Sequence, residues 1–140
     1  MPSFVSHTSV DAGNAYEQAE FWKQVLGYVD DPDDPNSPGD PECSIEDPET
    51  GHTILFIEVP ERKTLKNRLH FDLRPRPDSG TRDEELTRLL ALGARQVSDL
   101  RGIDGPGTGW VVLADPEGNE FCILRGHHEV PDNYAHLVSG

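Results

Sequence analysis

Residues 110–125 read WVVLADPEGNEFCILR: two short apolar runs joined by the turn sequence DPEGN. A related stretch occurs earlier, where DPETG at 47–51 leads into the apolar run 53–59. Aspartate, proline and glycine are typical of tight turns, and short apolar runs beside such turns are typical of strands. The return of this pattern after about 65 residues indicates an internal repeat.

The region before each turn repeats as well. A histidine in an apolar or β-branched run precedes a glycine by 20 residues in the first half (His7, Gly27) and by 23 in the second (His70, Gly93). Each glycine ends a stripe of apolar residues at helical spacing, which predicts a helix between histidine and glycine. The sequence therefore predicts two copies of one β-α-β-β-β unit.

Each predicted helix has a recognisable start. Asn14 precedes the first stripe and is typical of an N-cap, and Thr81 with Glu84 has the spacing of a capping box. The stripes themselves are Ala15, Ala19, Trp22, Val25 and Leu26, then Leu86, Leu89 and Leu90. Strands are expected at 4–10, 43–45, 53–59, 69–73, 97–100, 110–114 and 120–124.

The predicted fold class is α+β. Because one unit cannot bury both faces of its sheet, we expect two βαβββ modules to form a cupped, mostly antiparallel sheet with the helices on the outer face. The domain spans 1–126, with module one at about 3–60, a linker at 61–68 and module two at about 69–125. Residues 127–140 form a C-terminal tail.

Composition excludes several classes of protein. Twelve basic against 26 acidic residues give a net charge of −14, which argues against binding nucleic acid or an anionic membrane surface. No apolar run approaches the roughly 20 residues of a membrane-spanning helix. Two cysteines make no disulfide framework, and the N-terminus does not look like a signal peptide. We therefore expect a cytoplasmic protein.

The repeat, the strand histidines and the runs KNRLHFDLRP (66–75) and 110–125 together resemble the vicinal oxygen chelate superfamily. This superfamily includes glyoxalases, extradiol dioxygenases, fosfomycin-resistance enzymes and bleomycin-resistance proteins, and the resemblance is greatest to its glyoxalase-like group. It implies a homodimer. In the enzymes, it also implies a divalent metal that binds two neighbouring oxygens of the substrate.

The resemblance assigns four ligand positions. His7 and His70 stand at the first position of each module, and Ile57 stands at the third, with Glu58 one residue away. The fourth, usually a glutamate, is Cys122. Glu120 lies two residues earlier on the same strand face. Two imidazoles and a thiolate favour zinc over the iron of an oxygenase. Alternatively, the histidines are satisfied by hydrogen bonds and Cys122 is a buried apolar side chain.

Two functions follow from this incomplete ligand set. The first is a small-molecule-binding protein without catalysis, similar to bleomycin-resistance proteins, whose acidic surface attracts a cationic ligand into a pocket lined by Trp110, Ile57 and Cys122. The second is a metal-dependent lyase, isomerase or dioxygenase-type enzyme in which Glu58 or Glu120 moves a proton. A structural or partner-binding module is the third reading.

Overall fold

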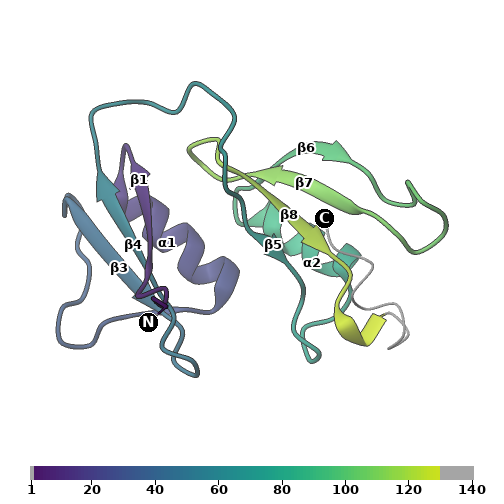
Figure 1. Ribbon diagram of the computed structural model, residues 1–140, viewed down its shortest axis with the longest axis horizontal. Helices are drawn as coiled ribbons and strands as arrows, with labels where there is room; N and C mark the ends of the chain where they lie inside the picture. The colour runs from purple at the N-terminus through teal and green to yellow at the C-terminus, as the bar shows by residue number, and fades with distance from the viewer. Residues whose placement is uncertain (1, 130–140) are drawn as a thin grey trace. The chain divides into compact units, whose positions relative to one another are not determined.

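The computed structural model describes residues 2–129, which divide into two compact units between Arg62 and Lys63. Unit 1 holds the residues up to Arg62, and unit 2 holds those from Lys63 onward. Each unit has a sheet and a helix of its own (Figure 1). Of the predicted tail, residues 130–140 lie outside the described residues, and 127–129 form a short 3-10 turn, η1 (His127–Glu129).

Unit 1 is a four-stranded sheet with one helix. Its strand order is β1-β4-β3-β2, with β1 parallel to β4 and the other neighbours antiparallel. Its elements are β1 (Thr8–Ala12), α1 (Ala15–Leu26), β2 (Val29–Asp30), β3 (Glu42–Glu46) and β4 (Thr53–Glu58).

Unit 2 repeats this plan. Its strand order is β5-β8-β7-β6, again with one parallel pair, β5 and β8. Its elements are β5 (Asp72–Leu73), α2 (Arg82–Ala91), β6 (Arg95–Asp99), β7 (Trp110–Ala114) and β8 (Glu120–Leu124). The shared element and strand order confirms the α+β fold of two βαβββ modules with mostly antiparallel pairing. That the two sheets join around one cupped surface stays a prediction.

Three helix ends are as predicted, whereas α2 ends at Ala91 with Leu92 as its C-cap, one residue before the predicted Gly93. The Asn14 side chain accepts a hydrogen bond from the Glu17 N–H at 3.0 Å, and Gly27 ends α1 in the left-handed conformation that glycine adopts without strain. Thr81 and Glu84 form both bonds of a capping box at the start of α2.

The two DPE turns are also built alike. Asp47 and Asp115 are both buried, and each carboxylate accepts the backbone N–H two residues on, from Glu49 at 2.9 Å and from Glu117 at 3.0 Å. Because a buried carboxylate is stabilised by N–H donors, these aspartates hold the turns that precede β4 and β8.

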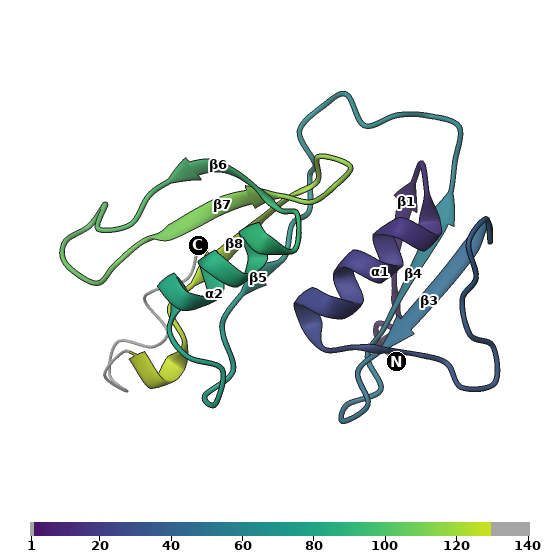
Figure 2. The same ribbon diagram turned by 180° about the vertical axis from the view of Figure 1, so that it is seen from behind.

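Each helix covers one face of its sheet (Figures 1 and 2). The face under α1 carries Cys43, Ile45, Ile54 and Phe56, and that under α2 carries Val111, Leu113, Phe121 and Ile123, all at most 1% exposed. Alternation along the strands places Leu55 and Ile57 on the opposite face of unit 1, and Trp110, Val112 and Cys122 on that of unit 2. These opposite faces are called the open faces below.

The first strand of each unit is shorter than predicted. The run 4–10 was expected as one strand, but β1 begins only at Thr8, and Phe4 is 89% exposed. In the second unit only Asp72 and Leu73 of the run 69–73 form a strand, and Leu69 is 90% exposed. In unit 1 the partner strand β4 starts at Thr53, so residues 4–6 have no residue of β4 opposite them. In unit 2 β8 starts at Glu120, two residues before Cys122, so Leu69 has no residue of β8 opposite it. The predicted strand histidines therefore lie just before their strands.

Within residues 2–129 no helix is long and apolar enough to cross a membrane.

Candidate functional site

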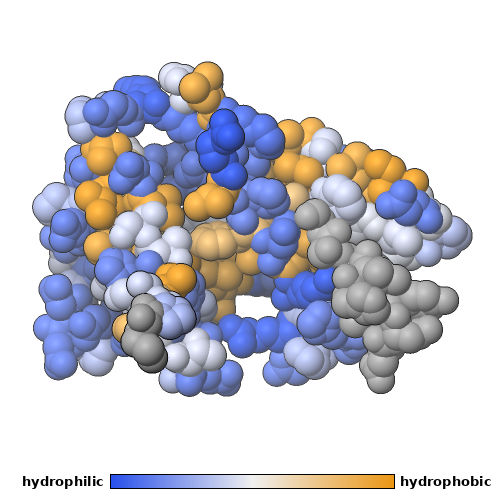
Figure 3. All heavy atoms as spheres, viewed as in Figure 1, coloured by the Kyte–Doolittle hydropathy of each residue, from blue (hydrophilic) through white to orange (hydrophobic). Residues whose placement is uncertain are grey.

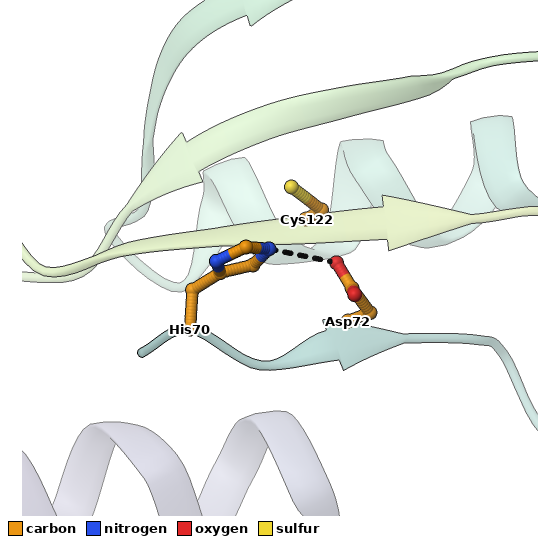
Figure 4. A group of neighbouring side chains, drawn as sticks. All are labelled: His70, Asp72 and Cys122. Atoms are coloured by element: carbon orange, nitrogen blue, oxygen red, sulfur yellow. Dashed lines mark ion pairs between the residues drawn. The ribbon is translucent and has the colours of Figure 1, made fainter. Parts of the chain in front are cut away.

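His70, Asp72 and Cys122 lie together on unit 2 (Figure 4). One ligand atom from each side chain lies within 4.8 Å of the other two, and the His70 Nε2 atom is 3.3 Å from Asp72 Oδ1. Imidazole nitrogen, carboxylate oxygen and thiolate sulfur are all ligands of Zn²⁺ in proteins. Among the described residues this is the one group of three or more potential ligands that lie so close together.

The parallel pairing of β5 and β8 creates this group. Asp72 stands opposite Cys122 in the register, and the Cys122 N–H donates to the Phe71 carbonyl at 2.9 Å. His70 lies two residues before Asp72, so extended backbone turns both side chains to one side. Figure 4 shows both rising from the β5 segment toward β8. The arrangement therefore follows from backbone pairing that is independent of any bound ion.

Two of the three side chains are open to solvent and the third is not. The side chains of His70 and Asp72 are 41% and 37% exposed, whereas Cys122 is 6% exposed. Burial raises the pKa of the Cys122 thiol to about 11, and the negative charge of Asp72 and a hydrogen bond to its carboxylate act in the same direction. Without a metal, Cys122 is a protonated thiol and a poor nucleophile at neutral pH.

The donor spacing fits a metal with a small adjustment. Zinc holds nitrogen and oxygen at about 2.0–2.2 Å and sulfur at about 2.3 Å, so tetrahedral ligand atoms lie roughly 3.3–3.8 Å apart. The ligand atoms of His70, Asp72 and Cys122 lie within 4.8 Å of one another, a limit about 1 Å larger than the spacing of ligand atoms around a bound zinc ion. His70 and Asp72 are exposed enough to close that gap by side-chain rotation.

The sequence reasoning placed His70 and Cys122 among the ligands but missed Asp72. The signal was the His-x-Asp spacing in LHFDL, which puts two potential ligands on one side of an extended segment. A resemblance that assigns one ligand to each strand does not single out Asp72.

Glu120, a candidate proton carrier, has another partner. Its carboxylate forms an ion pair with Lys66, and its backbone N–H donates to Asn67 Oδ1 at 3.0 Å. The hydrogen bond from Lys66 lowers the pKa of Glu120, which makes its carboxylate a weaker base. Glu120 shares the open face with Cys122, two residues earlier on β8.

Apolar side chains continue the open face beyond the ligand group. Val112 stands opposite Cys122 and Trp110 opposite Leu124, and both Val112 and Trp110 are half-buried. Figure 3 shows hydrophobic residues in orange where Figure 1 draws β7. An apolar surface beside polar ligands is a common composition of small-molecule sites.

The remaining predicted residues belong to unit 1. His7 is exposed, and its Nδ1 lies 3.0 Å from the Ser6 hydroxyl. Ile57 is on the open face, opposite Asp11 and Glu42. Glu58 is exposed at the end of β4, and strand alternation places it on the same face of the sheet as Phe56. That His7 and His70 bind one metal stays a prediction.

Comparison with known proteins extends over nearly the whole chain. The sequence model of a family described as the glyoxalase-like domain matches residues 7–124. No curated protein sequence matches the chain.

Solved structures share the fold at low sequence identity. A mutant of the fosfomycin resistance protein FosX from Listeria monocytogenes, complexed with Mn(II) and 1S,2S-dihydroxypropylphosphonic acid, is 18% identical. Its TM-score is 0.65, over 92% of this chain and 94% of that one. A possible glyoxalase from Bacillus cereus is 12% identical, with a TM-score of 0.62 over 88% and 99%. FosX from Mesorhizobium loti is 11% identical, with a TM-score of 0.61 over 89% and 92%.

Proposed function

Because the chain belongs to the glyoxalase-like domain family and has the fold of the vicinal oxygen chelate superfamily, we propose that it binds a divalent metal through His70, Asp72 and Cys122 and holds a small-molecule ligand against it. The observation that carries this proposal is the nitrogen, oxygen and sulfur group within 4.8 Å on the open face of unit 2. FosX structures that hold Mn(II) with a dihydroxyphosphonate or with sulfate support a metal and an oxygen-bearing ligand on this fold.

The residues of unit 2 have distinct roles in this proposal. His70, Asp72 and Cys122 fill three positions around the metal and leave a fourth open to a ligand oxygen. A metal bound there would supply Lewis acidity toward that oxygen. Val112 and Trp110 offer apolar contact to the rest of the ligand. Catalysis by Glu58 or Glu120, a homodimer and a cytoplasmic location stay predictions from the sequence.

Cobalt substitution tests the metal site without any assay of activity. Co²⁺ bound to a thiolate gives a charge-transfer band in the near ultraviolet, and we expect this band in the wild type and its loss in His70→Ala. His127→Ala is the matched control, because His127 is an exposed histidine of unit 2 outside the group. A wild type without the band, or equal loss in both variants, would refute the proposal.

Zinc is expected to bind more tightly than manganese, by about a hundredfold or more. A thiolate and an imidazole favour zinc, whereas Mn²⁺ prefers oxygen ligands and stands at the weak end of the divalent affinity series. Competition between the two metals, followed by metal analysis of the dialysed protein, measures the ratio. Equal occupancy at equal concentration would contradict the role of Cys122.

Zinc affinity is also expected to depend on pH. The Cys122 thiol, with a pKa raised to about 11, must lose its proton when it binds. The apparent affinity should therefore rise about tenfold per pH unit between about pH 7.5 and 9, because one thiol proton is released for each metal ion bound. Competition with an indicator of known pH dependence measures the slope. A flat profile in the wild type would show that no thiol proton is displaced.

A further inference from the structure

We propose that the ligand of this site is anionic and that its oxyanion group binds the Lys66 ammonium group; this rests on the proposed function. A carboxylate and any other small oxyanion both offer a negatively charged oxygen to an ammonium group.

Charge is divided unequally between the two units. Residues 1–62 contain two basic and fourteen acidic side chains, a formal charge of −12, whereas residues 63–140 contain ten and twelve, a charge of −2. The segment 63–70, KTLKNRLH, has three basic residues, no acidic residue, and His70 at its end. The expectation of a cationic ligand rests on the net charge, most of which belongs to unit 1. The charges that adjoin the ligand group in sequence are positive.

Asn67, the next residue in the sequence, holds Lys66 close to the metal-ligand residues on β5 and β8. Asn67 Nδ2 donates to the Glu120 carbonyl at 3.2 Å and to the Leu69 carbonyl at 2.6 Å, and its Oδ1 accepts the Glu120 N–H. These bonds fix the backbone of the segment at the start of β8. Glu120 lies two residues from Cys122 on one face, which is about 7 Å along a strand.

The partner that Lys66 has in the structure is itself an oxyanion. The Glu120 carboxylate takes the position beside Lys66 that a carboxylate of a ligand would take. The Lys66 side chain is 75% exposed, so the ion pair is open to solvent, and such pairs are weak. A ligand whose other oxygen binds the metal can therefore displace Glu120 from Lys66.

Lys66 is followed by another basic residue of the same segment. Arg68, two residues further on, is exposed and has no hydrogen bond or ion pair among residues 2–129. A second cation is thus available close to Lys66 in the chain, and none of the three basic residues of 63–70 is needed to neutralise another group in that segment.

The test compares D-glycerate with D-glyceramide, which has the same diol and carries an uncharged amide in place of the carboxylate. Each probe is titrated into the cobalt-substituted protein and followed by the change in the cobalt spectrum. The variants are Lys66→Met, Glu120→Gln and the double variant. Arg95→Met is the matched control, since Arg95 is exposed on β6, two strands from β8 at the other edge of the sheet.

We expect glycerate to bind at least tenfold more tightly than glyceramide. Lys66→Met should weaken glycerate binding about tenfold and leave the binding of glyceramide and of cobalt unchanged. Arg95→Met should leave the binding of glycerate, glyceramide and cobalt unchanged. Glu120→Gln should tighten glycerate binding because it frees Lys66. The double variant should still bind glycerate weakly, because Lys66 contacts the ligand directly. If Lys66 only neutralised Glu120, the loss of the Glu120 charge would restore glycerate binding.

Three results would overturn the inference. They are equal binding of both probes, no spectral response to glycerate, and recovery of glycerate binding in the double variant. Each would leave the proposed metal site intact, provided that the thiolate-to-cobalt band is present. Absence of that band in the wild type would instead remove the proposed function, and the inference would fall with it.

Discussion

Replacing Cys122 with serine is expected to lower the affinity for Zn²⁺ by about a hundredfold or more. The sulfur is the one soft ligand of the group, and a serine hydroxyl does not ionise at neutral pH as a metal-bound thiol does. Serine is close to cysteine in size, so the packing of β8 should be retained. Zinc competition against a chelator of known affinity measures the change.

The second cysteine provides a matched control. Cys43 is also buried, and burial raises its pKa to about 11 as well, but it lies on the helix-covered face of unit 1. Cys43→Ser should therefore leave the zinc affinity unchanged. If Cys122→Ser retained wild-type affinity, or if both substitutions lowered it equally, Cys122 would not be a ligand.

Gly109→Ala is expected to cause the largest loss of stability among glycine-to-alanine substitutions in unit 2. A Cβ atom built at Gly109 would lie 1.9 Å from the Leu100 carbonyl oxygen, and its φ of +85° disfavours any side chain. The clash involves backbone that cannot move aside easily, because the Leu100 N–H donates to the Trp110 carbonyl at 2.9 Å. The connection between β6 and β7 must therefore distort.

The control for this prediction is Gly105→Ala. Gly105 also has a positive φ, +117°, but a Cβ there meets nothing within 4 Å, so the substitution isolates the strain of the backbone conformation alone. Urea unfolding should show Gly109→Ala at least about 2 kcal/mol less stable than Gly105→Ala. Equal stability of the two variants would mean that the loop relaxes without cost.

The fold could be predicted from the sequence because its signals are local. Asn14, Gly27, Thr81 and Glu84 determine helix ends through bonds within a few residues, and the DPE turns act in the same way. The strands β7 and β8 were predicted at their observed bounds, since both are apolar and bracketed by turn residues.

The lengths of the first strands could not be predicted from composition. Phe4 and Leu69 belong to runs with good strand propensity, but neither has a strand residue opposite it in the register, and pairing partners are far apart in the sequence. The same dependence on pairing explains the site. Asp72 becomes a neighbour of Cys122 only through the β5–β8 register, which joins residues 50 positions apart.

The partner of Glu120 was unpredictable for a related reason. Its position on the face of Cys122 follows from strand alternation, which the sequence predicts. The Lys66 contact depends on how the segment 63–70 folds back over the start of β8, which Asn67 determines through three hydrogen bonds. No pattern in the sequence indicates such a loop conformation.

X-ray absorption at the zinc edge of protein purified without chelators is the most direct test of the His70, Asp72 and Cys122 site. We expect about one zinc per chain with a single sulfur ligand at about 2.3 Å and nitrogen or oxygen ligands at about 2.0–2.2 Å. The sulfur contribution should disappear in Cys122→Ser and persist in Cys43→Ser. A zinc shell without sulfur, or no bound zinc after reconstitution, would show that His70, Asp72 and Cys122 do not form a zinc site.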